Sequence, residues 1–128
     1  MGKLKLIGNP LSPFNSRVLI TLAYKGIDYD LEYHDSITNK ESLEEKNPLG
    51  NVPVLILEDG TAIFESMGII DLLDSLPQYA DRPKVFPADP IKRAQVYMKI
   101  ARLDAINTRI GPLIRGDTAK AVDNFEKD

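Results

Sequence analysis

The 128-residue sequence predicts an α/β fold in which a mixed four-stranded sheet carries helices on both faces. The first supporting observation is the alternation of short strand-like and helix-like segments between residues 3 and 76. The second is the βαβ order at the start, because such a crossover makes the first two strands parallel. The third is Asp59-Gly60 between two apolar runs, a dipeptide that tolerates the positive φ of tight hairpins and so predicts an antiparallel last pair.

The first three elements are a strand, a helix and a second strand. Lys3–Ile7 alternates like a half-buried strand and ends at Gly8-Asn9-Pro10. Ser12-Pro13 then opens a helix, because Ser is a good N-cap and Pro suits the first helical position. Lys25-Gly26 is a typical helix stop. Ile27–Tyr33 alternates as the second strand.

The next elements complete the sheet. A short polar helix is expected before Asn47-Pro48, and Val54–Leu57 and Thr61–Phe64 are the two strands of the hairpin. Ser66 is predicted to cap a helix that closes at Leu76-Pro77. The resulting order, β-α-β-α-β-β-α, is the thioredoxin-like arrangement.

The sequence divides into a thioredoxin-like domain at 1–80, a proline-spaced linker at 81–88 and a partial helical domain at 89–128, the start of an all-α domain. In the third part, Asp89-Pro90 reads as N-cap and first position of a helix running to about Arg109. This helix carries two apolar stripes and therefore needs two partners. We expect one partner to be the preceding domain, and the other to be either a segment absent from this sequence or a second subunit, as in a homodimer.

Composition excludes several classes of function. The net charge is −3 and no basic run appears, which argues against nucleic acid as a partner. The apolar runs are too short to span a membrane, and the N-terminus has no signal-peptide pattern, so a cytoplasmic location is expected. With no cysteine, disulfides, thiolate metal sites and redox pairs are impossible. His34, the one histidine, is expected to be solvated at a strand end, so neither a metal centre nor a catalytic triad is predicted.

The run Asn47–Leu57 carries the strongest indication of a binding site. Pro53 stands at the mouth of a buried strand, where its missing N–H is tolerated. If the Val52-Pro53 bond is cis, the main-chain N–H and C=O of Val52 face outward and can pair with an extended peptide. Glu65-Ser66 lies where the next strand meets a helix, so a carboxylate and a helix N-terminus are available to a ligand's charged groups. Together these features predict a site for a small peptide.

Four blocks resemble one known family. The chain is similar to the cytosolic glutathione transferases, especially the serine-type tau and zeta classes. The likeness covers residues 3 to about 76 and rests on Ser12–Val18, Leu22–Tyr29, Asn47–Leu55, and Glu65-Ser66 with Ile69-Ile70.

The resemblance implies a role for each residue that matches the family's motifs. Ser12 would be the catalytic residue, whose hydroxyl stabilises the glutathione thiolate. Val52 would pair with the cysteinyl unit beside a cis Pro53, and Glu65 and Ser66 would bind the γ-glutamyl group. Three further positions would complete the glutathione site: Lys40 at the glycyl carboxylate, Asn51 beside it, and Phe14 at the entrance for a hydrophobic electrophile. Glutathione would be a co-substrate, and no prosthetic group is implied.

The implied function is therefore a glutathione transferase that detoxifies electrophiles. One alternative is a non-catalytic interaction or regulatory module with the same fold, and another is a thioredoxin-like binding domain that does not hold glutathione. Full family members continue through several more helices, which complete the electrophile pocket and the dimer interface. Activity of the 128-residue chain thus depends on whether those helices are present.

Overall fold

The computed structural model describes residues 3–34, 40–114 and 116, and divides the chain into two compact units, Met1–Val85 and Phe86–Asp128. The second unit contains the helix α4 (Pro90–Ile114). The elements of the first unit are β1 (Leu4–Gly8), α1 (Pro13–Lys25), β2 (Tyr29–Tyr33), α2 (Lys40–Lys46), β3 (Val54–Ile56), β4 (Ala62–Phe64), α3 (Ser66–Ser75) and the 3₁₀ turn η1 (Pro77–Tyr79).

The four strands form one mixed sheet in the order β2-β1-β3-β4. β1 and β2 are parallel, whereas β3 is antiparallel to both β1 and β4. The hairpin between β3 and β4 turns at Gly60, whose φ is 90°, and Asp59 accepts a hydrogen bond of 2.9 Å from the N–H of Thr61. The predicted fold class is confirmed, including the antiparallel hairpin.

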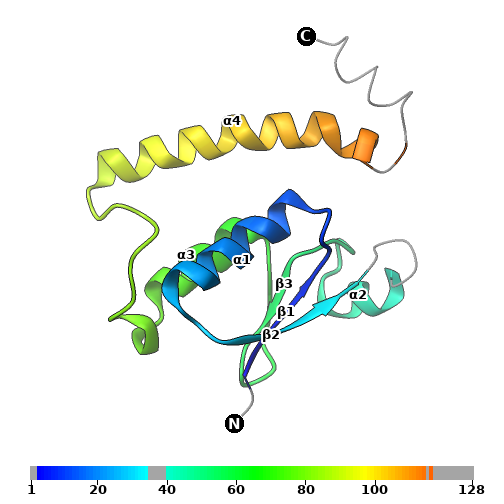
Figure 1. Ribbon diagram of the computed structural model, residues 1–128, viewed down its shortest axis with the longest axis horizontal. Helices are drawn as coiled ribbons and strands as arrows, with labels where there is room; N and C mark the ends of the chain where they lie inside the picture. Colours follow the sequence, from blue (N-terminus) through cyan, green and yellow to red (C-terminus); the bar gives the residue numbers. More distant parts are fainter. Residues whose placement is uncertain (1–2, 35–39, 115, 117–128) are drawn as a thin grey trace. The chain divides into compact units, whose positions relative to one another are not determined.

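Helices cover both faces of this sheet. In Figure 1, α1 and α3 lie side by side over one face, and α2 lies on the other. Ile7 and Val54 form a buried cluster with Leu43 of α2. Since side chains alternate along a strand, their neighbours Leu6 and Leu55 face α1 and α3, and both are fully buried. The sheet therefore has an apolar core on each side.

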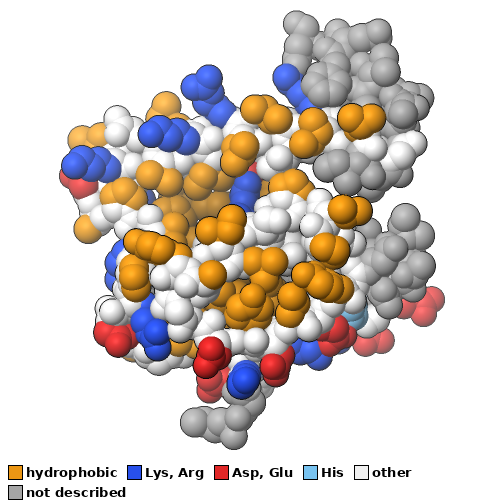
Figure 2. All heavy atoms as spheres, viewed as in Figure 1, with side chains coloured by type: hydrophobic (Ala, Val, Ile, Leu, Met, Phe, Trp, Pro, Cys, Tyr) orange, Lys and Arg blue, Asp and Glu red, His pale blue; other side chains and the backbone are white. Residues whose placement is uncertain are grey.

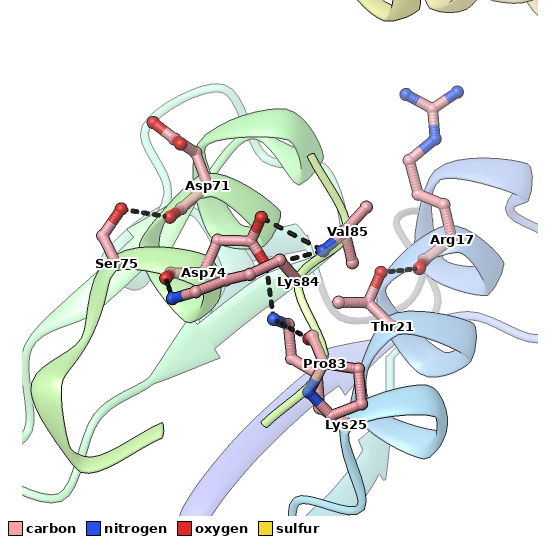
Figure 3. A network of polar contacts seen from close by, with 9 residues as sticks. All are labelled: Arg17, Thr21, Lys25, Asp71, Asp74, Ser75, Pro83, Lys84 and Val85. Carbon is pink, nitrogen blue, oxygen red and sulfur yellow. Dashed lines mark hydrogen bonds and ion pairs between the residues drawn. The ribbon is translucent and has the colours of Figure 1, made fainter. Parts of the chain in front are cut away.

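A buried ion pair joins α1, α3 and the segment that follows them (Figure 3). The ammonium of Lys25 contacts the carboxylate of Asp74 and donates a hydrogen bond of 2.9 Å to the carbonyl of Pro83. The N–H of Val85 donates to both carboxylate oxygens of Asp74, at 3.0 and 3.2 Å. The ammonium of Lys84 contacts the main-chain carbonyl of Asp74. These contacts fix residues 83–85 against α1 and α3.

His34 is buried, with 8% of its surface exposed, so the prediction that it is solvated is wrong. Its main-chain N–H donates to the carbonyl of Gly8 at 2.8 Å, and its carbonyl accepts a hydrogen bond of 3.3 Å from the side chain of Asn9. The ring contacts the carboxylate of Glu32. The hydrogen bond between His34 and Gly8 continues the parallel pairing of β1 and β2 by one residue, and this pairing holds His34 in a buried position.

Two helix ends also differ from prediction. Ser66 is the first residue of α3 and does not cap it; the N-cap is Glu65, whose φ of 82° turns the chain sharply out of β4 without a side-chain cap bond. The long helix continues past Arg109 to Ile114 and includes Pro112. Proline has a helical φ, but inside a helix it removes one hydrogen bond and its ring crowds the carbonyl four residues earlier; here this falls near the helix end.

The second unit has an aromatic contact of its own at the start of α4. The ring of Phe86 stacks on Tyr97 with centroids 5.2 Å apart, and the guanidinium of Arg93 lies 4.8 Å from the Phe86 centroid. Apolar side chains are exposed along α4 among lysines and arginines (Figure 2), including Ile91, Met98, Leu103 and Ile106. None of the helices in the described ranges is long and apolar enough to cross a membrane.

Candidate functional site

The pairing of the strands brings four connections to one end of the sheet. Val54, the first residue of β3, pairs with Ile7 near the end of β1 and with Phe64 at the end of β4. The parallel pairing sets the ends of β1 and β2, at Gly8 and Tyr33, next to each other. The residues directly after β1, β2 and β4 and the segment before β3 therefore lie at the same end.

Val52-Pro53 forms the segment before β3, and its peptide bond is cis. The side chain of Val52 packs against the cluster of Ile7, Leu43 and Val54, which directs its main chain away from the core. In the described part of the chain, the N–H and C=O of Val52 take part in no turn or loop hydrogen bond. These two groups are therefore available to pair with an extended ligand.

Asn47 organises the loop that leads to Val52, and its side chain is fully buried. Its amide nitrogen donates to the carbonyl and the side-chain oxygen of Asn51, at 2.9 and 2.8 Å. Its amide oxygen accepts a hydrogen bond of 3.0 Å from the N–H of Leu49, and its own carbonyl accepts one of 2.8 Å from Gly50. The Asn47 side chain thus pairs with three polar groups of the loop, and the Asn47 carbonyl pairs with a fourth.

Glu65 and Ser66 form the segment after β4. Glu65 is exposed, whereas Ser66 is buried with 2% of its surface accessible. A guanidinium nitrogen of Arg17 lies 3.4 Å from the Ser66 hydroxyl oxygen, and the guanidinium carbon lies 4.9 Å from the centroid of the Phe14 ring. The N-terminus of α3 thus has a hydroxyl beside a guanidinium and an exposed glutamate as its N-cap, residue types that suit the carboxylate and ammonium of an amino acid.

Ser12 is the N-cap of α1 and follows β1 at the same end of the sheet. Its N–H donates to the carbonyl of Asn9 at 3.0 Å, and its hydroxyl oxygen accepts a hydrogen bond of 3.3 Å from the N–H of Asn15. Because the oxygen is engaged as an acceptor, the hydroxyl proton remains to be donated elsewhere. The half-buried hydroxyl lies at the positive end of a 13-residue helix.

Comparisons of the sequence and of the structure with known proteins identify the family of this chain. The sequence model described as "Glutathione S-transferase, N-terminal domain" matches residues 11–76, more than half of the chain. The chain belongs to the glutathione S-transferase family. This confirms the resemblance that the four sequence blocks indicated.

Individual relatives come from plants, animals and bacteria. The chain is 37% identical over 96 residues to glutathione S-transferase U10 of Arabidopsis thaliana, covering 74% of this chain and 40% of that protein. It is similar to the crystal structure of a tau class glutathione S-transferase from mango, with a TM-score of 0.75 and 29% identity over 98% of this chain and 59% of the mango chain. Rice GST1, solved in complex with glutathione, has a TM-score of 0.69 and 27% identity, over 81% of this chain and 48% of the rice chain. The chain spans about half the length of these relatives.

The structure brings five of the eight predicted site residues of this glutathione S-transferase family member to the same end of the sheet: Ser12, Val52, Pro53, Glu65 and Ser66. Phe14 lies half-buried on the first turn of α1, under Arg17. The side-chain amide of Asn51 is turned toward Asn47. Lys40 is the first residue of α2, and its side chain lies outside the described part of the structure.

Sequence reasoning assigned no role to Arg17 or Asn47, although both stand inside blocks that resemble the glutathione S-transferases. The signal for Asn47 was the Asn-Pro dipeptide, because Asn side chains pair with the main chain two residues on in such turns. Arg17 gave no local signal, since its contact with Ser66 spans 49 positions and depends on how α1 packs beside α3.

Proposed function

We propose that this chain binds glutathione at the end of the sheet and stabilises its thiolate for attack on an electrophile. The observation that carries the proposal is the meeting, at one end of one sheet, of the available main chain of Val52, the Glu65-Ser66 turn and the Ser12 hydroxyl. Val52 would pair with the cysteinyl main chain, as an added strand does. The rice relative solved with glutathione supports the choice of ligand.

The γ-glutamyl group of glutathione carries an ammonium and a carboxylate, and the α3 end offers partners for both. Glu65 would bind the ammonium, and Ser66 with the N-terminus of α3 would bind the carboxylate. The Arg17 guanidinium, 3.4 Å from the Ser66 hydroxyl, would add a positive charge beside that carboxylate. We assign Lys40 and Asn51 to the glycyl end and Phe14 to the wall of a hydrophobic electrophile site, as the family resemblance implies.

Ser12 would act by stabilising the thiolate. A free thiol has a pKa of roughly 8.5, so it is mostly protonated at neutral pH. Lowering that pKa by about two units requires preferential stabilisation of the thiolate by roughly 2.7 kcal/mol. A hydrogen bond to a charged group contributes about 1.5–3 kcal/mol, which is the right size for the Ser12 hydroxyl alone. The positive end of α1 would add a smaller amount.

Two measurements test the proposal. Calorimetry with S-hexylglutathione tests binding, and conjugation of a chloronitrobenzene substrate tests turnover, each with the native chain and with Ser12→Ala. We expect Ser12→Ala to keep most of the binding but to lower turnover by roughly ten- to a hundredfold, since the lost hydrogen bond acts on the thiolate. Binding without turnover by the native chain would favour the non-catalytic module. An absence of binding would reject the proposal.

We also propose that the chain pairs with a second copy through α4. Ile91, Met98, Leu103 and Ile106 are exposed on this helix, and apolar side chains in such number favour a protein partner. Light scattering at high protein concentration should give the mass of a dimer, and the mass of a single chain would contradict this assembly.

A further inference from the structure

Asn15 is a buried polar residue for which the proposed chemistry has no direct use. It belongs to the first turn of α1, has no accessible surface, and carries a side-chain oxygen without a hydrogen-bond partner among the described residues. A buried, unpartnered acceptor costs about as much as a lost hydrogen bond. A leucine of similar shape would avoid this cost, so the amide is not explained by core packing alone.

The side-chain nitrogen of Asn15 reaches the loop that holds Ser12. It donates a hydrogen bond of 3.1 Å to the carbonyl of Asn9, and the same carbonyl accepts the N–H of Ser12 at 3.0 Å. The main-chain N–H of Asn15 meanwhile donates to the Ser12 hydroxyl oxygen at 3.3 Å. One residue therefore holds Ser12 from two sides, through Asn9 and directly.

The space for this arrangement depends on Gly8 at the end of β1. A Cβ at position 8 would lie 2.0 Å from the side-chain oxygen of Asn15, closer than two atoms approach without a bond. The Asn15 side chain thus lies directly on the main chain of β1, where it can move little. Its donor is held toward Asn9 because the side chain is fully buried and lies against Gly8.

We propose that Asn15 is a positioning residue that fixes the Ser12 hydroxyl for the bound thiolate; the inference rests on the function proposed above. The amide locks the 9–12 loop so that the hydroxyl oxygen accepts from α1 and its proton is directed outward. Without the amide, the loop loses a donor and the hydroxyl is held less firmly. Loss of the Asn15 amide therefore raises the pKa of the bound thiol. It changes the affinity for glutathione only weakly, since Val52, Glu65 and Ser66 are unaltered.

The test compares Asn15→Leu with the native chain and with a control, Thr21→Val. Leu keeps the shape of the side chain and removes the donor. Thr21 is buried on the same helix, and its hydroxyl donates a hydrogen bond of 2.8 Å to the carbonyl of Arg17. Thr21→Val therefore also removes one buried side-chain donor to a main-chain carbonyl, but away from Ser12. The first readout is the pKa of bound glutathione, obtained from the thiolate absorbance as a function of pH. The second is the exchange rate of the Ser12 amide proton, measured by NMR without ligand.

Asn15→Leu should lower the thiolate fraction at neutral pH by about three- to tenfold and raise the exchange rate of the Ser12 amide by at least about tenfold. Thr21→Val should change neither. Asn15→Ala, which cannot collide with Gly8, serves if the Leu variant does not fold. An unchanged thiol pKa, or an equal shift in Thr21→Val, overturns the inference. If the native chain does not bind glutathione, the proposed function fails, and an unchanged Ser12 exchange rate then rejects the positioning role as well.

Discussion

Because the ion pair between Lys25 and Asp74 is buried, breaking it should cost a predictable amount of folding free energy. The Lys25 side chain has no accessible surface and that of Asp74 has 6%, so neither charge is solvated when its partner is removed. Lys25→Met keeps the length of the side chain and removes the ammonium. Asp74 would then keep the N–H of Val85 as a donor, but its charge would remain buried.

Removing one partner of a buried pair destabilises a protein by about 3–5 kcal/mol. This is a large fraction of the 5–15 kcal/mol that holds a typical domain folded. We expect Lys25→Met to lower the free energy of unfolding by about that amount, and the melting temperature by roughly 10–20 °C. Lys3→Met, at an exposed position, is the matched control and should change stability by less than about 0.5 kcal/mol.

The assay is urea unfolding followed by circular dichroism, combined with limited digestion by trypsin. In the native chain, cleavage after Lys84 is opposed because the N–H of Val85 is bound to Asp74. Lys25→Met should therefore speed this cleavage. The double variant Lys25→Met with Asp74→Leu should regain part of the lost stability, because no unpaired charge remains buried. A loss below about 1 kcal/mol, the value of an exposed pair, would refute the reasoning.

Two further predictions concern the loop before β3 and the edge strand β2. Asn47→Ala removes three side-chain hydrogen bonds to Leu49 and Asn51. The affinity for glutathione, measured by calorimetry, should therefore fall about tenfold or more. An unchanged affinity would show that the loop before β3 keeps its shape without the Asn47 amide. A hydrogen bond from Lys5, and to a lesser extent one from His34, lowers the pKa of Glu32 in the folded chain. The ionised Glu32 carboxylate therefore stabilises the fold at pH values above the ordinary carboxyl pKa. This stabilisation is lost as the pH falls through the lowered pKa of the folded state. Glu32→Gln should therefore cost less than about 1 kcal/mol at neutral pH, and urea midpoints of variant and native chain should converge in acid; a constant difference at all pH values would contradict this.

The sheet was predictable because its signals are local. Alternating residues in β1, the Asp59-Gly60 turn and the Ser12-Pro13 helix start each act within a few positions, and each forms the element that its pattern predicts. The positions of Val52 and Glu65-Ser66 at one end followed from the order of those elements. The candidate site was predictable to the same extent, since it is built at the ends of strands.

The residues that sequence reasoning missed depend on contacts distant in the chain or on burial. His34 is covered because β2 runs parallel to β1, and its distance of 26 positions from Gly8 hides that contact from any local pattern. Ser66 loses the cap position because Glu65 adopts a positive φ, which its side chain does not favour. Lys25 reads as an ordinary helix-ending lysine, and only the packing of α3 reveals the buried carboxylate beside it.

The boundary between the two units after Val85 bears on where in the chain the proposed glutathione site is encoded. Every residue that we assign to the tripeptide lies before residue 67, inside the first unit. This unit ends at Val85, whose N–H donates a hydrogen bond to the carboxylate of Asp74. Under the proposed function, a substitution confined to the second unit replaces none of the residues that we assign to glutathione. Sequence changes in the second unit can therefore leave the proposed thiol-binding residues as they are.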